Sequence, residues 1–198
     1  MTPERLLEIY GKASGLAAEK VIDRLDQHCR DFIAASPFIV LATSDGSTLD
    51  VSPKGDPAGF VAVEDDRHLI LPDRPGNNRI DGLWNIMEHP QVSIIFFIPS
   101  VTETLRIKGR AEILDDPALL SKHAMKGRDP LTVTRIEVEE IFLHCGKAPL
   151  RAGLWTPDAW PATRPVGTLF EMAQDHAGMK NEDASEEAVQ KIYQATLY

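Results

Sequence analysis

Polar and apolar residues alternate along most of the central part of the chain, which is the pattern of β-strands buried on one face. The pattern predicts about six strands, at residues 38–43, 60–63, 68–71, 92–98, 102–113 and 133–144, with a short further alternation at residues 49–51. Residues 92–98 are almost continuously apolar, as expected for a strand at the centre of a sheet.

Apolar residues also recur at helical spacing before the first strand. They predict an amphipathic helix over residues 18–35, which Pro37 would end. Short helices are expected after the turn at residues 76–78 and over residues 117–125, where Asp116 is placed as N-cap.

The last part of the chain has a different character. Residues 157–183 are rich in proline, glycine and polar residues, and they are expected to form a loop or an arm that needs a partner surface. Asp183 with Glu186 resembles a capping box for a final helix at residues 184–196.

Short connections between successive strands indicate an α+β protein with an antiparallel barrel, because alternating βαβ units are missing from the pattern. The 198 residues are expected to form one domain, with N-terminal helices at about 3–35, the barrel at about 37–146, and an arm and helix at about 147–198. The sequence has no GxGxxG or GxxxxGK[ST] motif, so a nucleotide would have to bind to a barrel.

The formal net charge of -9 disfavours a general nucleic-acid binder. Five basic residues form a local exception that suits a small anionic ligand: Lys54, Arg79, Arg106, Lys108 and Arg110. The two cysteines form no CxxC motif, and the histidines show no metal-ligand spacing, so neither a disulfide framework nor a metal site is expected. A polar N-terminus and apolar runs too short for a bilayer favour a cytoplasmic protein with no membrane partner.

Two turn-like segments are candidates for anion binding. In the first, Ser52 and Lys54 would contact an anion or the polar edge of a ring; the alternative is a solvated turn. In the second, Asn78 and Arg79 precede a helix whose first N–H groups favour an anion; the alternative is plain capping by asparagine.

A third candidate lies on the strand at residues 102–113. Thr104, Arg106 and Lys108 share one face, which is either a ligand surface or a solvated face. His144 is either an acid–base group or structural. Trp155 is expected either to wall a flat cofactor or to be buried at an interface. No catalytic residue is identified, because the sequence has no GxSxG motif and no activated nucleophile.

These segments, in this order, resemble the pyridoxamine 5'-phosphate oxidase-like FMN-binding split-barrel family. The resemblance is carried by SPKGDPAGF, PDRPGNNRID, ETLRIKGRA and HCGKAPLRAGLW, and it covers about residues 15–165. It implies a six-stranded antiparallel Greek-key split barrel with flanking helices, and a homodimer with FMN at its interface. Lys54, Arg79 and Arg106 match the phosphate-binding positions, and the partner's C-terminal residues, with Trp155 among them, would close the site.

The arginine-and-histidine substrate motif of the vitamin B6 oxidases has no counterpart at residues 149–155. The resemblance therefore implies an FMN-dependent oxidoreductase whose small-molecule substrate the sequence does not name, in which Lys54 or Lys108 would stabilise the reduced flavin. The alternatives are a non-catalytic flavin-binding, storage or sensing protein, and a relative that uses coenzyme F420 or haem. The predicted cofactor-binding residues are Ser52, Lys54, Asn78, Arg79, Thr104, Arg106, Lys108 and Trp155.

Overall fold

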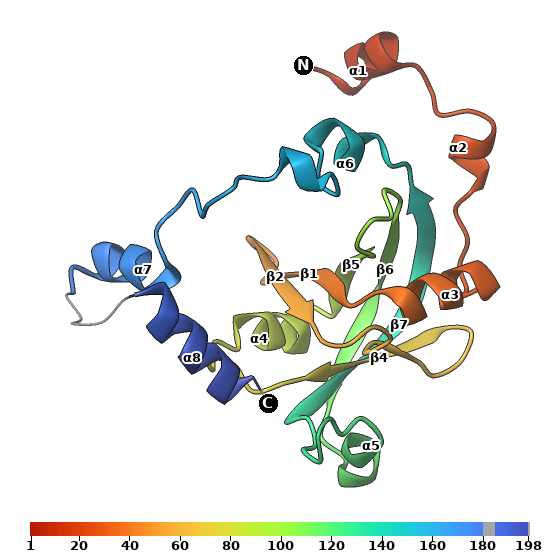
Figure 1. The fold of residues 1–198 in the computed structure, drawn as a ribbon. Coiled ribbons are helices and arrows are strands. Elements are labelled where there is room, and N and C mark those ends of the chain that lie inside the picture. Colours follow the sequence, from red (N-terminus) through yellow and green to blue (C-terminus); the bar gives the residue numbers. More distant parts are fainter. Residues whose placement is uncertain (180–184, 198) are drawn as a thin grey trace.

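The structure is a computed structural model that describes residues 1–179 and 185–197. Its centre is one antiparallel sheet of seven strands in the order β2-β1-β5-β6-β7-β4-β3, which curls into a split barrel (Figure 1). The expected α+β barrel is therefore confirmed; the strand predicted at residues 60–63 has only two residues, and the short alternation at residues 49–51 is part of a seventh, seven-residue strand. The strands are β1 (Phe38–Ser44), β2 (Leu49–Gly55), β3 (Ala62–Val63), β4 (His68–Asp73), β5 (Gln91–Phe97), β6 (Thr104–Leu114) and β7 (Thr132–His144).

Alternation along the strands places one row of apolar side chains inside the barrel, where they form the core. The inward side chains of β5, Val92, Ile94 and Phe96, belong to the barrel core and are therefore covered within the same chain. A second copy is therefore not needed to cover the inner face of this apolar strand. The fully buried strand residues are Ile39, Leu69, Ile70, Ile94, Phe96, Leu105, Ile107, Val133, Ile136, Val138 and Ile141.

The helices lie before, after and at the mouth of the barrel. Helices α3 and α4 pack on the core through Cys29, Ile33 and Ile86. Helices α1 and α2 and the segment from α6 to α8 lie outside the barrel (Figure 1). None of the helices in the described ranges has both the length and the apolar character needed to cross a membrane. The helices are α1 (Pro3–Tyr10), α2 (Leu16–Glu19), α3 (Gln27–Ala35), α4 (Asp81–Glu88), α5 (Pro117–Lys122), α6 (Lys147–Ala152), the 3-10 helix Pro157–Ala159, α7 (Leu169–Ala177) and α8 (Glu186–Thr196).

The predicted helix over residues 18–35 is shorter than expected and begins only at Gln27. The Asp26 carboxylate accepts a hydrogen bond from the Cys29 N–H at 2.8 Å, which fixes the helix start there. Ile22 is extended instead, and it exchanges two backbone hydrogen bonds with Ile141 of β7. Helical spacing around residue 22 was therefore misleading, because this segment pairs with an exposed edge of β7 instead of forming a helix.

The expectation of an irregular arm at residues 157–183 is also partly wrong, because α7 lies within it. Thr168 and Glu171 form a capping box at the start of α7: each side chain accepts a hydrogen bond from the other residue's backbone N–H. The proposed cap Asp183 lies outside the described residues. Within them, Ser185 caps α8 by accepting a hydrogen bond from the Ala188 N–H at 3.3 Å. That all 198 residues form a single domain stays a prediction.

The two free cysteines lie in opposite environments and should react very differently. Burial raises the pKa of the Cys29 thiol from 9.0 to about 12, and the Asp26 carboxylate adds to this effect. Cys145 is exposed. At pH 8 a thiol-reactive disulfide reagent should label one thiol of the native protein rapidly, and a second only after denaturation. Rapid labelling of a native Cys145→Ala variant would contradict the described packing of α3.

Candidate functional site

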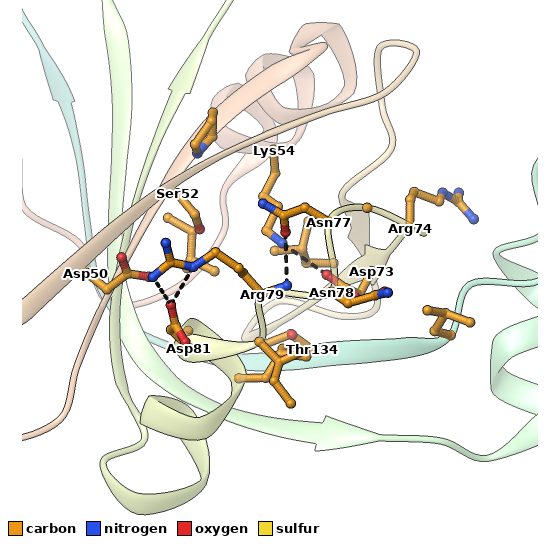
Figure 2. Close-up of a pocket in the computed structure, with 18 residues that line it drawn as sticks. Asp50, Ser52, Lys54, Asp73, Arg74, Asn77, Asn78, Arg79, Asp81 and Thr134 are labelled. Carbon is orange, nitrogen blue, oxygen red and sulfur yellow. Dashed lines mark hydrogen bonds and ion pairs between the residues drawn. The ribbon is translucent and has the colours of Figure 1, made fainter. Parts of the chain in front are cut away.

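A cavity of about 460 Å³ opens between β2, the end of β4 and the start of α4 (Figure 2). Its volume is within the range of small-molecule sites, about 300–1,000 Å³. The polar residues that line it are Asp50, Ser52, Lys54, Asp73, Arg74, Asn77, Asn78, Arg79, Asp81 and Thr134.

Strand β2 supplies one wall of this pocket. Asp50, Ser52 and Lys54 follow each other at every second position, so they share one face of the strand and line the cavity. Leu49 and Val51 lie on the opposite face and are exposed. The segment around Ser52 and Lys54 is therefore part of a strand, and the alternative of a solvated turn is wrong.

Two ion pairs connect the end of β2, including the residue after it, with the end of β4. Strands β2 and β4 are not neighbours in the sheet. The Lys54 Nζ atom lies 3.0 Å from an Asp73 carboxylate oxygen. The Arg74 Nε atom lies 2.9 Å from a carboxylate oxygen of Asp56, whose side chain is only 3% exposed. Arg74 also donates to the His123 carbonyl at 2.9 Å. These contacts hold the two sides of the barrel together at the pocket.

The loop before α4 supplies the second wall. Asn78 has a φ of 59°, in the left-handed region, which turns the chain toward the helix. The Asn77 side chain accepts a hydrogen bond from the Arg79 N–H at 3.0 Å. The N-cap of α4 is Ile80, which offers no capping group, so the alternative of helix capping by asparagine is wrong.

Arg79 is the most accessible cation of the pocket. Its Nε and Nη2 atoms contact one Asp81 carboxylate oxygen at 3.0 and 2.7 Å (Figure 2). The two side chains are 77% and 57% exposed, and ion pairs of this kind contribute little stability because water screens them. A ligand oxyanion can therefore replace Asp81 at the guanidinium at low cost.

At the start of α4, the lining of the pocket includes one group that suits a hydroxyl, the Asp50 carboxylate. Gly82 lies beside it: a Cβ atom there would be at ordinary van der Waals distances, 3.5 Å from an Asp50 carboxylate oxygen and 3.6 Å from the Thr43 hydroxyl. Asn85 donates to the Thr43 hydroxyl at 3.1 Å. The cations Lys54 and Arg79 therefore suit the oxyanion of a ligand, and the Asp50 carboxylate near Gly82 suits a ligand that donates hydroxyl hydrogens.

The structure gathers only half of the predicted cofactor-binding residues. Ser52, Lys54, Asn78 and Arg79 line one pocket, whereas Thr104, Arg106, Lys108 and Trp155 lie outside it. Lys108 pairs with Glu140 at 2.8 Å, and the Trp155 indole donates to the Val101 carbonyl of its own chain at 2.9 Å. The Arg106 guanidinium stacks on the Phe142 ring, 4.1 Å from its centre.

Sequence reasoning missed the carboxylates of the pocket. Asp50 was detectable, because it continues the every-second-residue pattern of Ser52 and Lys54. Asp73 carries no local signal, because it meets Lys54 only when the sheet closes.

Comparisons with known proteins identify one family. Residues 25–145, more than half of the chain, match the family model described as pyridoxamine 5'-phosphate oxidase. Among solved structures, HupZ of Group A Streptococcus is 25% identical, with a TM-score of 0.48, over 60% of this chain and 93% of its own. A FAD-binding protein of Mesorhizobium loti is 21% identical, with a TM-score of 0.42, over 62% of this chain and 96% of its own. A search of curated proteins found no match.

The buried pair of Asp56 and Arg74 should dominate the stability of the pocket. Asp56→Ala leaves the Arg74 charge without this carboxylate and should lower the free energy of unfolding by about 3 kcal/mol. The double variant Asp56→Leu/Arg74→Met should recover much of this loss, because no buried charge is then left over. Urea unfolding followed by circular dichroism measures both.

The exposed ion pair between Arg79 and Asp81, at the same pocket, provides the matched control. Asp81→Ala should cost less than about 1 kcal/mol, because it breaks an exposed ion pair. Equal losses for Asp56→Ala and Asp81→Ala would contradict the view that the Asp56 pair closes the barrel.

Proposed function

Because the chain belongs to the pyridoxamine 5'-phosphate oxidase family, whose members generally bind a flavin, we propose that it is an FMN-dependent oxidoreductase that acts on a small molecule. The observation that carries this proposal is the pocket itself. Lys54 and Arg79, which lie on different elements, converge there with Ser52 and Asn78 (Figure 2).

The donor set fits the two polar parts of FMN. Lys54 and the planar fork of Arg79 would hold the phosphate, because both carry a positive charge and present N–H donors. Asp50 and Ser52 would accept hydrogen bonds from the hydroxyls of the ribityl chain.

When bound, FMN would supply the redox chemistry, so the protein needs no nucleophilic side chain. The protein would bind and orient the cofactor and shield it from water. One charge near Lys54 sets a limit on this role. Asp73 holds the ammonium group at 3.0 Å, which fixes its position and offsets part of its charge.

We also propose that the protein works as a homodimer with FMN at the interface, since members of this family are often dimeric. Four exposed apolar side chains on the two elements that line the pocket support this arrangement: Leu49 and Val51 on the outer face of β2, and Trp84 and Met87 on α4. A second copy that covered them would bury apolar surface and narrow the pocket mouth. In this arrangement Trp155 would reach the partner's cofactor, because it lies outside the pocket of its own chain.

A non-catalytic flavin carrier is the second candidate. One observation favours it: the described residues that line the pocket include no histidine, cysteine or tyrosine that could transfer a proton. Anaerobic reduction of the purified holoprotein by NADH and NADPH separates the two functions. Reduction followed by turnover with an acceptor supports the oxidoreductase, whereas a bound flavin that neither donor reduces supports the carrier.

The phosphate contacts predict that the protein discriminates between two flavins. FMN should bind at least about tenfold more tightly than riboflavin, because only FMN offers an oxyanion to Lys54 and Arg79. Flavin fluorescence quenching measures both affinities. Lys54→Ala and Arg79→Ala should each weaken FMN about tenfold or more while changing riboflavin little. Arg110→Ala, which removes a cation outside the pocket, should change neither, and equal affinity for the two flavins would refute the phosphate site.

If the exposed apolar side chains of β2 and α4 form the dimer interface, a charge introduced on α4 should disrupt the dimer. Met87→Glu should convert the dimer into monomers, because the new carboxylate would lose its water at the interface. Ala118→Glu places the same charge on α5, a helix that carries none of these four side chains, and should leave the dimer intact (Figure 1). Truncation after Ala148 should weaken both dimerisation and FMN binding. Light scattering measures the mass, and a wild-type monomer that binds FMN stoichiometrically would exclude this arrangement.

A further inference from the structure

A second group of basic side chains lies outside the pocket, on the outer face of β6 and β7. The register of these strands places Thr104 opposite His144, Arg106 opposite Phe142, and Lys108 opposite Glu140. Lys108 and Glu140 form an ion pair at 2.8 Å. Arg106 lies on the same face of β6, two residues before Lys108. Its neighbour on β7 is therefore the aromatic ring of Phe142, whereas the neighbour of Lys108 is the carboxylate of Glu140.

A third basic group arrives from the N-terminal part of the chain. Ile22 pairs with the edge of β7 at Ile141, and this brings Lys20 beside the end of the strand. The Lys20 ammonium donates to the Leu143 carbonyl at 2.8 Å and lies 5.3 Å from the centre of the Phe142 ring. The three basic residues thus meet around Phe142, since the His144 ring centre lies 4.8 Å from that of Phe142.

The contacts of these groups leave hydrogen-bonding capacity unused. The Nε atom of Arg106 is buried and has no hydrogen-bond partner within the described part of the chain. Among the described residues, no carboxylate forms an ion pair with Lys20, Arg106 or His144, although the protein carries a net charge of -9. Burial lowers the pKa of His144, and the charges of Arg106 and Lys20 lower this pKa further. An uncompensated positive field therefore surrounds the Phe142 ring.

We propose that Lys20, Arg106 and His144 form a binding site for the oxyanion of a small molecule, a carboxylate or a phosphate monoester. Phe142 holds the guanidinium plane by stacking, so that Arg106 is pre-oriented and its remaining N–H donors are available to the ligand. Lys20 adds a second charge from a different segment, and the His144 ring adds a donor. The assignment of this oxyanion to the substrate rests on the proposed oxidoreductase function, whereas the existence of the site does not.

The imidazole of His144 provides a local reporter that does not depend on FMN. NMR spectra of histidine-labelled protein, with the His144 signal assigned by its loss in His144→Gln, give the pKa of this group. Titration with sodium phosphate, and separately with sodium acetate, at constant ionic strength should move the His144 signal saturably and raise its pKa. The pKa rises because a neighbouring anion stabilises the protonated ring.

Four variants separate this site from the pocket. Arg106→Met should start with a higher His144 pKa, because one of the charges that lower it is gone, and should bind the anion at least about tenfold more weakly. Arg106→Lys, which keeps the charge without the stacked fork, should lie between this variant and the wild type. Arg110→Met removes a charge from the same strand without touching the cluster and should respond as the wild type does, and so should Arg79→Ala in the pocket.

The outcomes decide the proposal clearly. A saturable response of His144 to phosphate, to acetate or to both, lost in Arg106→Met, supports it and identifies which oxyanion the site accepts. No response to either anion overturns it. An Arg106→Met protein that responds like the wild type also overturns it, and this result would leave the FMN pocket unaffected.

Discussion

The closure of the barrel at one point, between strands that are not neighbours in the sheet, is the constraint on which the rest of the molecule depends. The Lys54–Asp73 and Arg74–Asp56 pairs bridge this gap, and the second is largely removed from water. Without closure the pocket would have only one wall, because β2 contributes one set of side chains and the loop after β4 contributes the other. The same contacts therefore contribute both to the fold and to the shape of the candidate site.

The protein uses its cations in two ways. In the pocket, Lys54 and Arg79 are already paired with carboxylates, so a ligand must compete with Asp73 and Asp81. On the outer face of β6, Arg106 is held by an aromatic ring, which orients the guanidinium without neutralising it. The carboxylates in the pocket stabilise the two cations when no ligand is bound. The aromatic ring at Arg106, by contrast, leaves the positive charge of the guanidinium in place. An acidic protein with two such places is suited to one small anionic ligand at each.

The sequence was informative wherever the signal is local. Alternation along β6 and β7 predicted the strands, and the short spacing of Ser52 and Lys54 and of Asn78 and Arg79 identified pocket residues. It was misleading where distant segments meet. Arg106, predicted as a phosphate ligand, lies opposite Phe142 and outside the pocket of its own chain, and its role in phosphate binding stays a prediction. Ile22 fits a helix by spacing, yet the free edge of β7 offers it two backbone hydrogen bonds. In both cases the contacting residue is far away in the sequence, so the residues around Arg106 or Ile22 do not indicate it.

The central claim is that FMN lies in the pocket between β2 and α4, with its phosphate held by Lys54 and Arg79. A crystal structure of the protein grown with FMN tests this claim most directly. The account predicts electron density for the phosphate within hydrogen-bond distance of both cations, with the ribityl chain toward Asp50 and Gly82. Density for the phosphate at Arg106, or a well-ordered pocket that contains no flavin at saturating FMN, would contradict it.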